Sequence, residues 1–291
     1  MDILFVLLNL ILAQGEAMTV KEHGKRYEKG GTFFNASICF FALIYTIISE
    51  FFVKDGLFFF PTKIWIYGIA SGICYAIGFY GAYLAFKLGS FGKTRLISTF
   101  GLVLPIFYGV VFLKETTTIY TYISLTLIAL SVFLMNYKTL EDNTKADNAK
   151  KWVFWIITYV LANFAISVLS KHQQLTFGSV CSNEFIMISY AVATISLLIL
   201  GFVRESEKLS ATFKNGFTYG ILAGAFNGAK NFFHIRAYMY LPLSIISPVS
   251  TALGIVISFV ISVVVYKEKF TFIQYISAFI GIIAAVLLNI K

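Results

Sequence analysis

Charged residues are scarce in this sequence. Asp, Glu, Lys and Arg make up 13% of its 291 residues, about half of what a soluble globular chain carries. Hydrophobic residues reach 58%, so the polar residues are too few to cover a water-soluble fold of this length. This composition excludes a cytosolic enzyme, a nucleic-acid-binding domain and a disordered regulator. It indicates a polytopic membrane protein, with the lipid bilayer as its surroundings and the cell membrane as its expected location.

Residues that build metal or catalytic sites are also few. Cys39, Cys74 and Cys181 lie inside apolar runs, and an odd number of such thiols provides neither a disulfide framework nor a metal spacing. The three histidines are isolated from the cysteines. The run Gly92-Lys93-Thr94 resembles the end of a phosphate-binding loop, but Leu88 stands where the first glycine is needed. We therefore expect no metal, no cofactor and no catalytic residue.

Long apolar runs are what the sequence has in abundance. Ten of them approach the 20 or so residues that a helix needs to cross the hydrocarbon, and their continuous character excludes spanning β-strands. We predict an all-α integral membrane protein with ten transmembrane helices. The predicted spans are residues 2–18, 32–52, 64–86, 94–113, 117–137, 152–171, 183–203, 215–238, 243–266 and 270–290.

The two halves of the chain resemble each other. Matching residues occur in the same order in both: Gln14 with Asn163, His23 with His172, Tyr67 with Tyr219, Gly72 with Gly224, and Lys114-Glu115 with Lys267-Glu268. We predict one five-helix repeat over 1–137, a polar linker over 138–151 and a second repeat over 152–291. Since five is odd, the second repeat enters the membrane from the opposite side. Such inverted repeats are typical of secondary transporters, which hold substrate between the halves.

The end of each half carries a related stretch. These stretches are AFKLGSFGKTRLISTFGLVLPIFYGVVFLKE at 85–115 and AYMYLPLSIISPVSTALGIVISFVISVVVYKE at 237–268. With the five-plus-five plan, they resemble the EamA-type branch of the drug/metabolite transporter superfamily. The resemblance implies transport of a small polar organic metabolite, such as an amino acid, a sugar or an amine. The competing class is a membrane-embedded enzyme acting on lipid-linked or small polar substrates, but the clustered carboxylates or histidines that it needs at a span end are not seen.

Polar residues inside spans are the candidates for substrate binding, because an ionisable side chain in hydrocarbon costs about 2.5 kcal/mol or more and therefore faces a cavity or a partner. On the eighth span, one narrow stripe contains Asn227, Asn231, His234 and Tyr238. Lys230 lies about 60° to the side of this stripe, and Arg236 lies on the opposite face near the span end. Lys230 either meets an anionic group of the substrate or pairs with a carboxylate such as Glu184 or Glu16.

Further candidates come from matching positions. Gln14 and Asn163 would present two amides to one central cavity, and Asn35 forms a similar pair with Asn183 or Glu184. These side chains can line a cavity, bond neighbouring helices or cap a helix.

Carboxylates near span ends are candidates for coupling. The position of Glu16 is similar to that of the first-helix glutamate of the small multidrug resistance branch. Glu16 is therefore a candidate for binding a coupling proton or ion, and Glu184 is a second candidate. Glu115 and Glu268 stand beside lysines and are expected to have a structural role. The coupling ion and assembly as a homo-oligomer are left open by the sequence.

Lys and Arg are distributed unevenly between the two sides. Counted together with the adjoining span ends, which hold Arg95 and Lys171, the side that follows the first, third, fifth, seventh and ninth predicted spans holds 16 of the 23, whereas the other side holds 5. The positive-inside rule therefore puts the linker 138–151 in the cytoplasm and both termini outside, while the superfamily resemblance implies termini inside. We expect a single cysteine in this linker to resist a membrane-impermeant thiol reagent applied to intact cells. Labelling from outside would contradict the orientation that the charges indicate.

Overall fold

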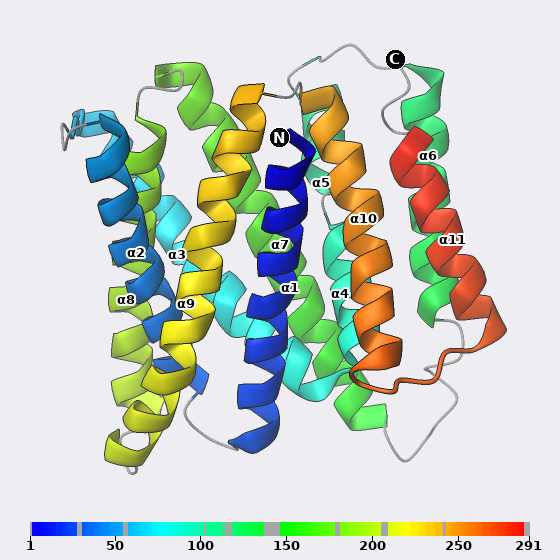
Figure 1. Ribbon diagram of the computed structural model, residues 1–291, viewed down its shortest axis with the longest axis horizontal. Coiled ribbons are helices and arrows are strands. Elements are labelled where there is room, and N and C mark those ends of the chain that lie inside the picture. The colour runs from blue at the N-terminus through cyan, green and yellow to red at the C-terminus, as the bar shows by residue number, and fades with distance from the viewer. Residues whose placement is uncertain are drawn as a thin grey trace. The chain divides into compact units, whose positions relative to one another are not determined.

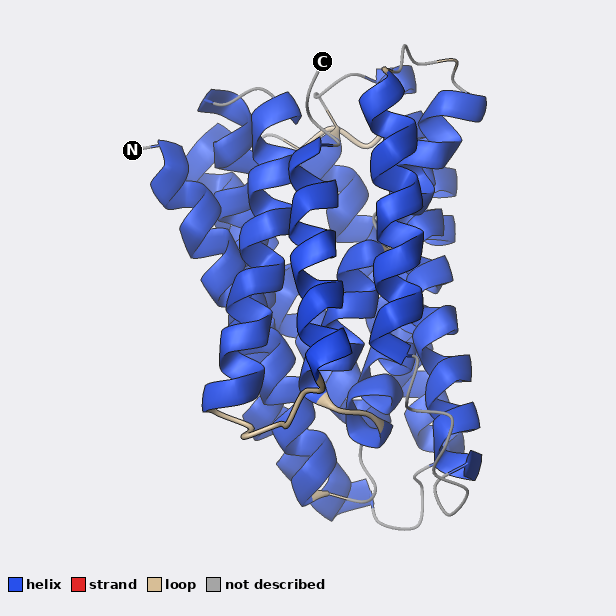
Figure 2. Ribbon diagram, turned by 90° about the vertical axis from the view of Figure 1, so that its right-hand side faces the viewer, coloured by secondary structure: helices blue, strands red, loops and turns tan. Residues whose placement is uncertain are grey.

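The computed structural model describes residues 2–27, 31–54, 58–101, 103–112, 114, 118–136, 146–177, 181–204, 209–240 and 243–287. Helices dominate these residues, and no strand occurs among them (Figure 2). The helices are α1 (Asp2–Arg26), α2 (Gly31–Lys54), α3 (Thr62–Leu88), α4 (Phe91–Phe100), α5 (Val103–Val111), α6 (Ile119–Asn136), α7 (Ala146–Phe177), α8 (Ser182–Arg204), α9 (Leu209–Tyr240), α10 (Leu243–Val264) and α11 (Phe272–Leu287).

Nine of the predicted spans correspond to one helix each. Four helical segments in the described part of the chain are both long and apolar enough to cross a membrane: Gly31–Phe51, Thr62–Leu88, Asn148–Phe177 and Ser182–Arg204. Shorter apolar helical segments occur at Tyr122–Ser131, Leu253–Val264 and Phe272–Ala284. The fold is therefore all-α and contains several membrane-length helices.

The predicted span 94–113 is not one helix. It is divided into α4 and α5 beside Gly101, and Pro105 explains the division because its nitrogen carries no hydrogen for the carbonyl group of Gly101. The amide of Leu104 donates to that carbonyl instead, at 3.2 Å. Counting apolar residues could not reveal this interruption, since every residue around it suits a membrane.

The helices belong to two compact units. The first unit contains residues 1–14, 88–157 and 233–291, and the second contains residues 15–87 and 158–232. Each unit therefore takes segments from both halves of the sequence. The contacts described below lie within one unit.

Glycines allow close helix packing in the second unit, where α2 lies beside α8 (Figure 1). A Cβ atom at Gly68 of α3 would lie 2.6 Å from the Ile188 side chain, and one at Gly72 would lie 2.7 Å from the backbone oxygen of Ser189 on α8. The same is true of α9 and α2: a Cβ at Gly224 would lie 2.9 Å from the backbone oxygen of Ile38. Small residues thus bring helix backbones together, as is common in membranes.

In the first unit, α10 packs on α4 and α11, and α11 lies beside α6 (Figure 1). The carboxylate of Glu268 accepts hydrogen bonds from the amides of Phe91 and Gly92 at 2.5 and 3.0 Å and from the Ser262 hydroxyl. It therefore caps the N-terminus of α4, where amides lack helical partners and the helix dipole favours a negative charge. These contacts give Glu268 a role in stabilising the start of α4.

The glycine contacts predict how alanine is tolerated. We expect Gly72→Ala to lower thermal stability in detergent, by the equivalent of about 1–3 kcal/mol, because the new methyl group meets backbone that cannot move aside. The matched control is Gly254→Ala on α10, where the nearest atom, in Leu10, lies 3.6 Å from the added Cβ. This control should be neutral or stabilising, since alanine favours a helix by about 1 kcal/mol. Equal effects of the two changes would contradict the packing.

Candidate functional site

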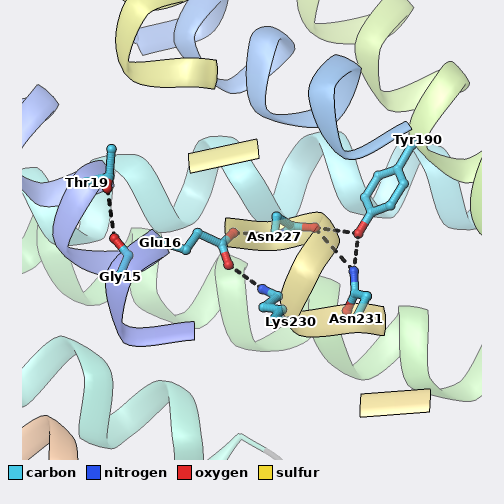
Figure 3. A network of polar contacts seen from close by, with 7 residues as sticks. All are labelled: Gly15, Glu16, Thr19, Tyr190, Asn227, Lys230 and Asn231. Atoms are coloured by element: carbon cyan, nitrogen blue, oxygen red, sulfur yellow. Dashed lines mark hydrogen bonds and ion pairs between the residues drawn. The ribbon is translucent and has the colours of Figure 1, made fainter. Parts of the chain in front are cut away.

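A network of five polar side chains lies inside the second unit (Figure 3). Glu16 of α1 forms an ion pair with Lys230 of α9 and accepts a hydrogen bond from the amide group of Asn227 at 2.7 Å. The side-chain oxygen of Asn227 accepts a hydrogen bond from the Tyr190 hydroxyl of α8 at 2.6 Å. Asn231 donates to that hydroxyl at 2.6 Å. Three helices from both halves of the sequence thus contribute to one connected network.

The network is buried but not sealed. Tyr190 and Asn227 are 1% and 2% exposed, whereas the side chains of Glu16 and Lys230 are 10% and 24% exposed. The ammonium and carboxylate cancel each other's charge, so the site has no formal net charge. It combines hydroxyl, amide and paired ionic groups, which both donate and accept hydrogen bonds. Such a mixture suits a neutral ligand with several hydroxyl groups.

Local packing holds the network in place. Gly15 precedes Glu16, and a Cβ atom there would lie 3.0 Å from the ring of Phe226 on α9. The absence of a side chain at Gly15 therefore lets α1 approach α9 at this level. On the other side, the Tyr190 ring packs against Tyr75 of α3, with 5.3 Å between ring centroids. Tyr190 also belongs to an apolar cluster with Ala36 and Ala193.

A second group of side chains surrounds His23 in the last turn of α1. The His23 ring is fully buried and stacks on Phe34 of α2, with centroids 4.1 Å apart and planes 6° apart. The rings of Tyr27, Tyr83 and Tyr219 lie 5.0, 5.6 and 5.7 Å away. Neither ring nitrogen of His23 has a hydrogen-bond partner within the described part of the chain.

Burial keeps His23 uncharged. His23 lies beyond the predicted span 2–18, and desolvation, together with the nearby Lys87 ammonium, lowers its pKa to about 4. The ring is therefore neutral at physiological pH. Arg26 and Lys87 lie over the rings of Tyr219 and Tyr83, each at 5.9 Å, so positive charges border this aromatic cluster.

A third polar group lies where α2 ends and α8 begins. Asn183 donates to the carboxylate of Glu50, and the amide of Phe59 donates to Glu184 at 3.2 Å. Both carboxylates are 1% exposed. Glu184 therefore bonds the segment before α3, whereas the ion pair of Lys230 is formed with Glu16.

The remaining amide candidates do not join the central network. Gln14 belongs to the first unit and donates to the Ser258 hydroxyl of α10 at 2.9 Å. Asn35 is buried and donates to the Gly31 carbonyl group at 2.7 Å, within α2. Asn163 is exposed and donates to a carbonyl group of its own helix, that of Tyr159, at 2.8 Å.

Some candidates fall outside what the structure describes. Helix α9 includes His234, Arg236 and Tyr238, but their side chains are not among the described ones, and Glu115 lies outside the described residues altogether. Of the stripe expected on α9, the structure thus brings Asn227 and Asn231 together with Lys230. Among the described residues, no group of three His, Cys, Asp or Glu side chains could hold a metal ion.

Two buried residues were missed by the sequence reasoning. Tyr190 was overlooked because tyrosine is common in apolar helices, and only its contacts reveal that its hydroxyl joins two asparagines. Glu50 could have been found, since it is an acidic residue near the end of the predicted span 32–52.

Comparisons with known proteins identify the family. No curated protein matches the chain. A solved structure described only as a crystal structure of a protein has the same fold, with a TM-score of 0.57 and 14% identity over 99% of this chain and 95% of the other. The family described as sugar transport protein matches residues 30–290. This match covers most of the sequence, and the chain therefore belongs to this family of membrane transporters.

Proposed function

We propose that this protein is a secondary transporter of a neutral sugar, and that the sugar binds at the network of Glu16, Tyr190, Asn227, Lys230 and Asn231. The family match supports a sugar as the transported class. Sugars present many hydroxyl groups, each of which can donate and accept hydrogen bonds. The network offers the complementary groups within one unit of the fold.

The ion pair between Glu16 and Lys230 carries this proposal. An unpaired Lys230 would favour an anionic substrate, which was one of two expectations for this residue. With Glu16 beside it, the ammonium is already compensated, and an added carboxylate or phosphate would compete with Glu16. A neutral polyhydroxylated solute meets no such competition. The geometry therefore favours an uncharged sugar over a sugar acid, a sugar phosphate or an amine.

Matched glycine contacts support transport by alternating access between two inverted repeats. In the sequence alignment of the halves, Gly72 of α3 matches Gly224 of α9. Gly72 packs on Ser189 and Val192 of α8, whereas Gly224 packs on Ile38 and Phe41 of α2. Ser189 lies 151 positions after Ile38 in the sequence, and Val192 lies 151 positions after Phe41. The two halves thus use equivalent positions for equivalent helix contacts, as inverted repeats require.

Coupling to a proton or another ion belongs to the same proposal. Glu16 is the candidate, because a carboxylate that binds a cation would weaken its hold on Lys230 and so alter the network. Glu184 is the second candidate, although its contact with Phe59 gives it a structural task as well. The membrane-embedded enzyme remains the competing class. It would show turnover of its substrate where a transporter shows only translocation.

Charge changes at the ion pair should redirect specificity. Glu16→Gln leaves the site positive, so uptake into proteoliposomes should shift towards glucuronate, by about tenfold or more relative to glucose, since a hydrogen bond to a charged group contributes roughly 1.5–3 kcal/mol. Lys230→Gln leaves the site negative and should shift uptake towards glucosamine. The matched control is the exposed pair Glu22 and Lys25 on α1, with atoms 3.3 Å apart. Glu22→Gln and Lys25→Gln should not change the preference. Preferences that stay the same in the Glu16 and Lys230 variants would contradict binding at this pair.

Substitutions at Glu16 and Lys230 should have non-additive effects on the free energy of unfolding. Lys230→Ala leaves the Glu16 carboxylate buried beside Asn227 without its cation, so we expect a loss of roughly 2–4 kcal/mol in unfolding free energy. Adding Glu16→Gln should recover part of this loss, because the uncompensated charge disappears. Thermal unfolding in detergent of the two single variants and the double variant measures the coupling. Strictly additive effects would show that the two groups do not interact.

A further inference from the structure

The two ends of the second unit carry equivalent contacts. Near one end, Tyr27, which directly follows α1, meets Tyr219 of α9, with ring centroids 5.9 Å apart. In the alignment that matches His23 with His172, Tyr27 matches Thr176, and Tyr219 matches Tyr67. The structure places the Tyr67 hydroxyl 3.4 Å from the Thr176 hydroxyl. A contact between the first and third helices of opposite repeats is therefore present twice.

The contact at the His23 end is closed. His23 and Phe34 are fully buried, and Tyr83 is 2% exposed. Gly31, the first residue of α2, has no side chain, and a Cβ atom there would overlap the Tyr83 ring. Aromatic rings from α1, α2, α3 and α9 thus pack together at this end. While these rings stay packed, a polar solute cannot pass between them, although the ring nitrogens of His23 are buried there without a hydrogen-bond partner among the described residues.

The equivalent end is built from different groups. Tyr67 and His172 are partly exposed, the Tyr67–Thr176 contact is exposed, and Leu175 is 63% exposed. One hydroxyl–hydroxyl contact of 3.4 Å stands where the other end has a stack of aromatic rings. Tyr67 also packs against a buried apolar cluster that includes Ile64 and Phe185. Opening this end therefore breaks one exposed hydroxyl contact and also separates Tyr67 from apolar side chains. The two ends are equivalent in sequence position but differ in closure.

We propose that these two contacts are the gates of one transport path, an aromatic gate at Tyr27–Tyr219 around His23 and a polar gate at Tyr67–Thr176, and that one opens as the other closes. The inference rests on the proposed transport function and assigns its moving parts. Glu16 lies between His23 and the N-terminus on α1, about two helical turns from His23, so the network lies beyond the aromatic gate along that helix.

Cross-linking the two sides of each gate tests this proposal. Two double-cysteine variants, Tyr27→Cys with Tyr219→Cys and Tyr67→Cys with Thr176→Cys, are made in a chain whose three native cysteines are replaced by alanine. A bifunctional thiol reagent of matched length should reduce glucose uptake at least tenfold in each variant, and a reducing agent should restore it. Added glucose should change the bridging rates at the two gates in opposite directions, because the sugar shifts the population between the two states.

The control pair lies in the first unit, where the Ser131 and Ser277 hydroxyls are 3.2 Å apart between α6 and α11. Bridging Ser131→Cys with Ser277→Cys should leave uptake unchanged. Restoration by the reducing agent separates a locked gate from a misfolded chain. Uptake that survives bridging at either gate, or rates that change in the same direction at both, would overturn the gate assignment alone. A wild-type protein that takes up no sugar would overturn the proposed function as well.

Discussion

The central constraint is the neutralisation of a buried charge. An ammonium inside an apolar helical unit is costly unless an anion and hydrogen-bond partners accompany it. Glu16 supplies the anion for Lys230, and Asn227 donates to Glu16 and connects it to Tyr190 and Asn231. Removing either charged group therefore changes both the stability of the unit and the chemistry of the site. The same contacts that permit Lys230 to lie there also set the charge and hydrogen-bonding groups of the proposed binding site.

Close helix packing fixes the positions of the helices that carry this network. Gly15 lets α1 approach α9 beside Phe226, and the close glycine contacts of α3 with α8 and of α9 with α2 fix the neighbouring helices. In a membrane these approaches are stabilised by van der Waals contact, since lipid tails are as apolar as the side chains. The helices that carry Glu16, Tyr190 and Asn227 are thus held by backbone packing around them.

The sequence predicted most of the helices, because a long apolar run in a membrane protein favours an α-helix. It also found Asn227, Lys230 and Asn231, since polar residues stand out in such runs, and it named Glu16 as one of two carboxylate partners for Lys230. It could not predict the division of α4 from α5, which depends on one lost hydrogen bond at Pro105. Nor could it choose between Glu16 and Glu184, because both residues satisfy the same electrostatic requirement and only tertiary contacts distinguish them.

A neutral site also bears on how the protein could change conformation. Moving an isolated charge through a low-dielectric interior carries a large desolvation cost, whereas a paired ammonium and carboxylate move as a dipole. If Glu16 and Lys230 stay paired while one proposed gate opens and the other closes, the energy barrier to this conformational change arises mainly from opening the gates. The two proposed gates then differ in what opening them breaks. One requires separating the stacked rings around His23, and the other requires breaking the Tyr67–Thr176 contact and the packing of Tyr67 on its apolar cluster. In the proposed transporter, the binding energy of the sugar would have to offset the cost of opening whichever gate is closed, and this requirement is what would couple substrate binding to the conformational change.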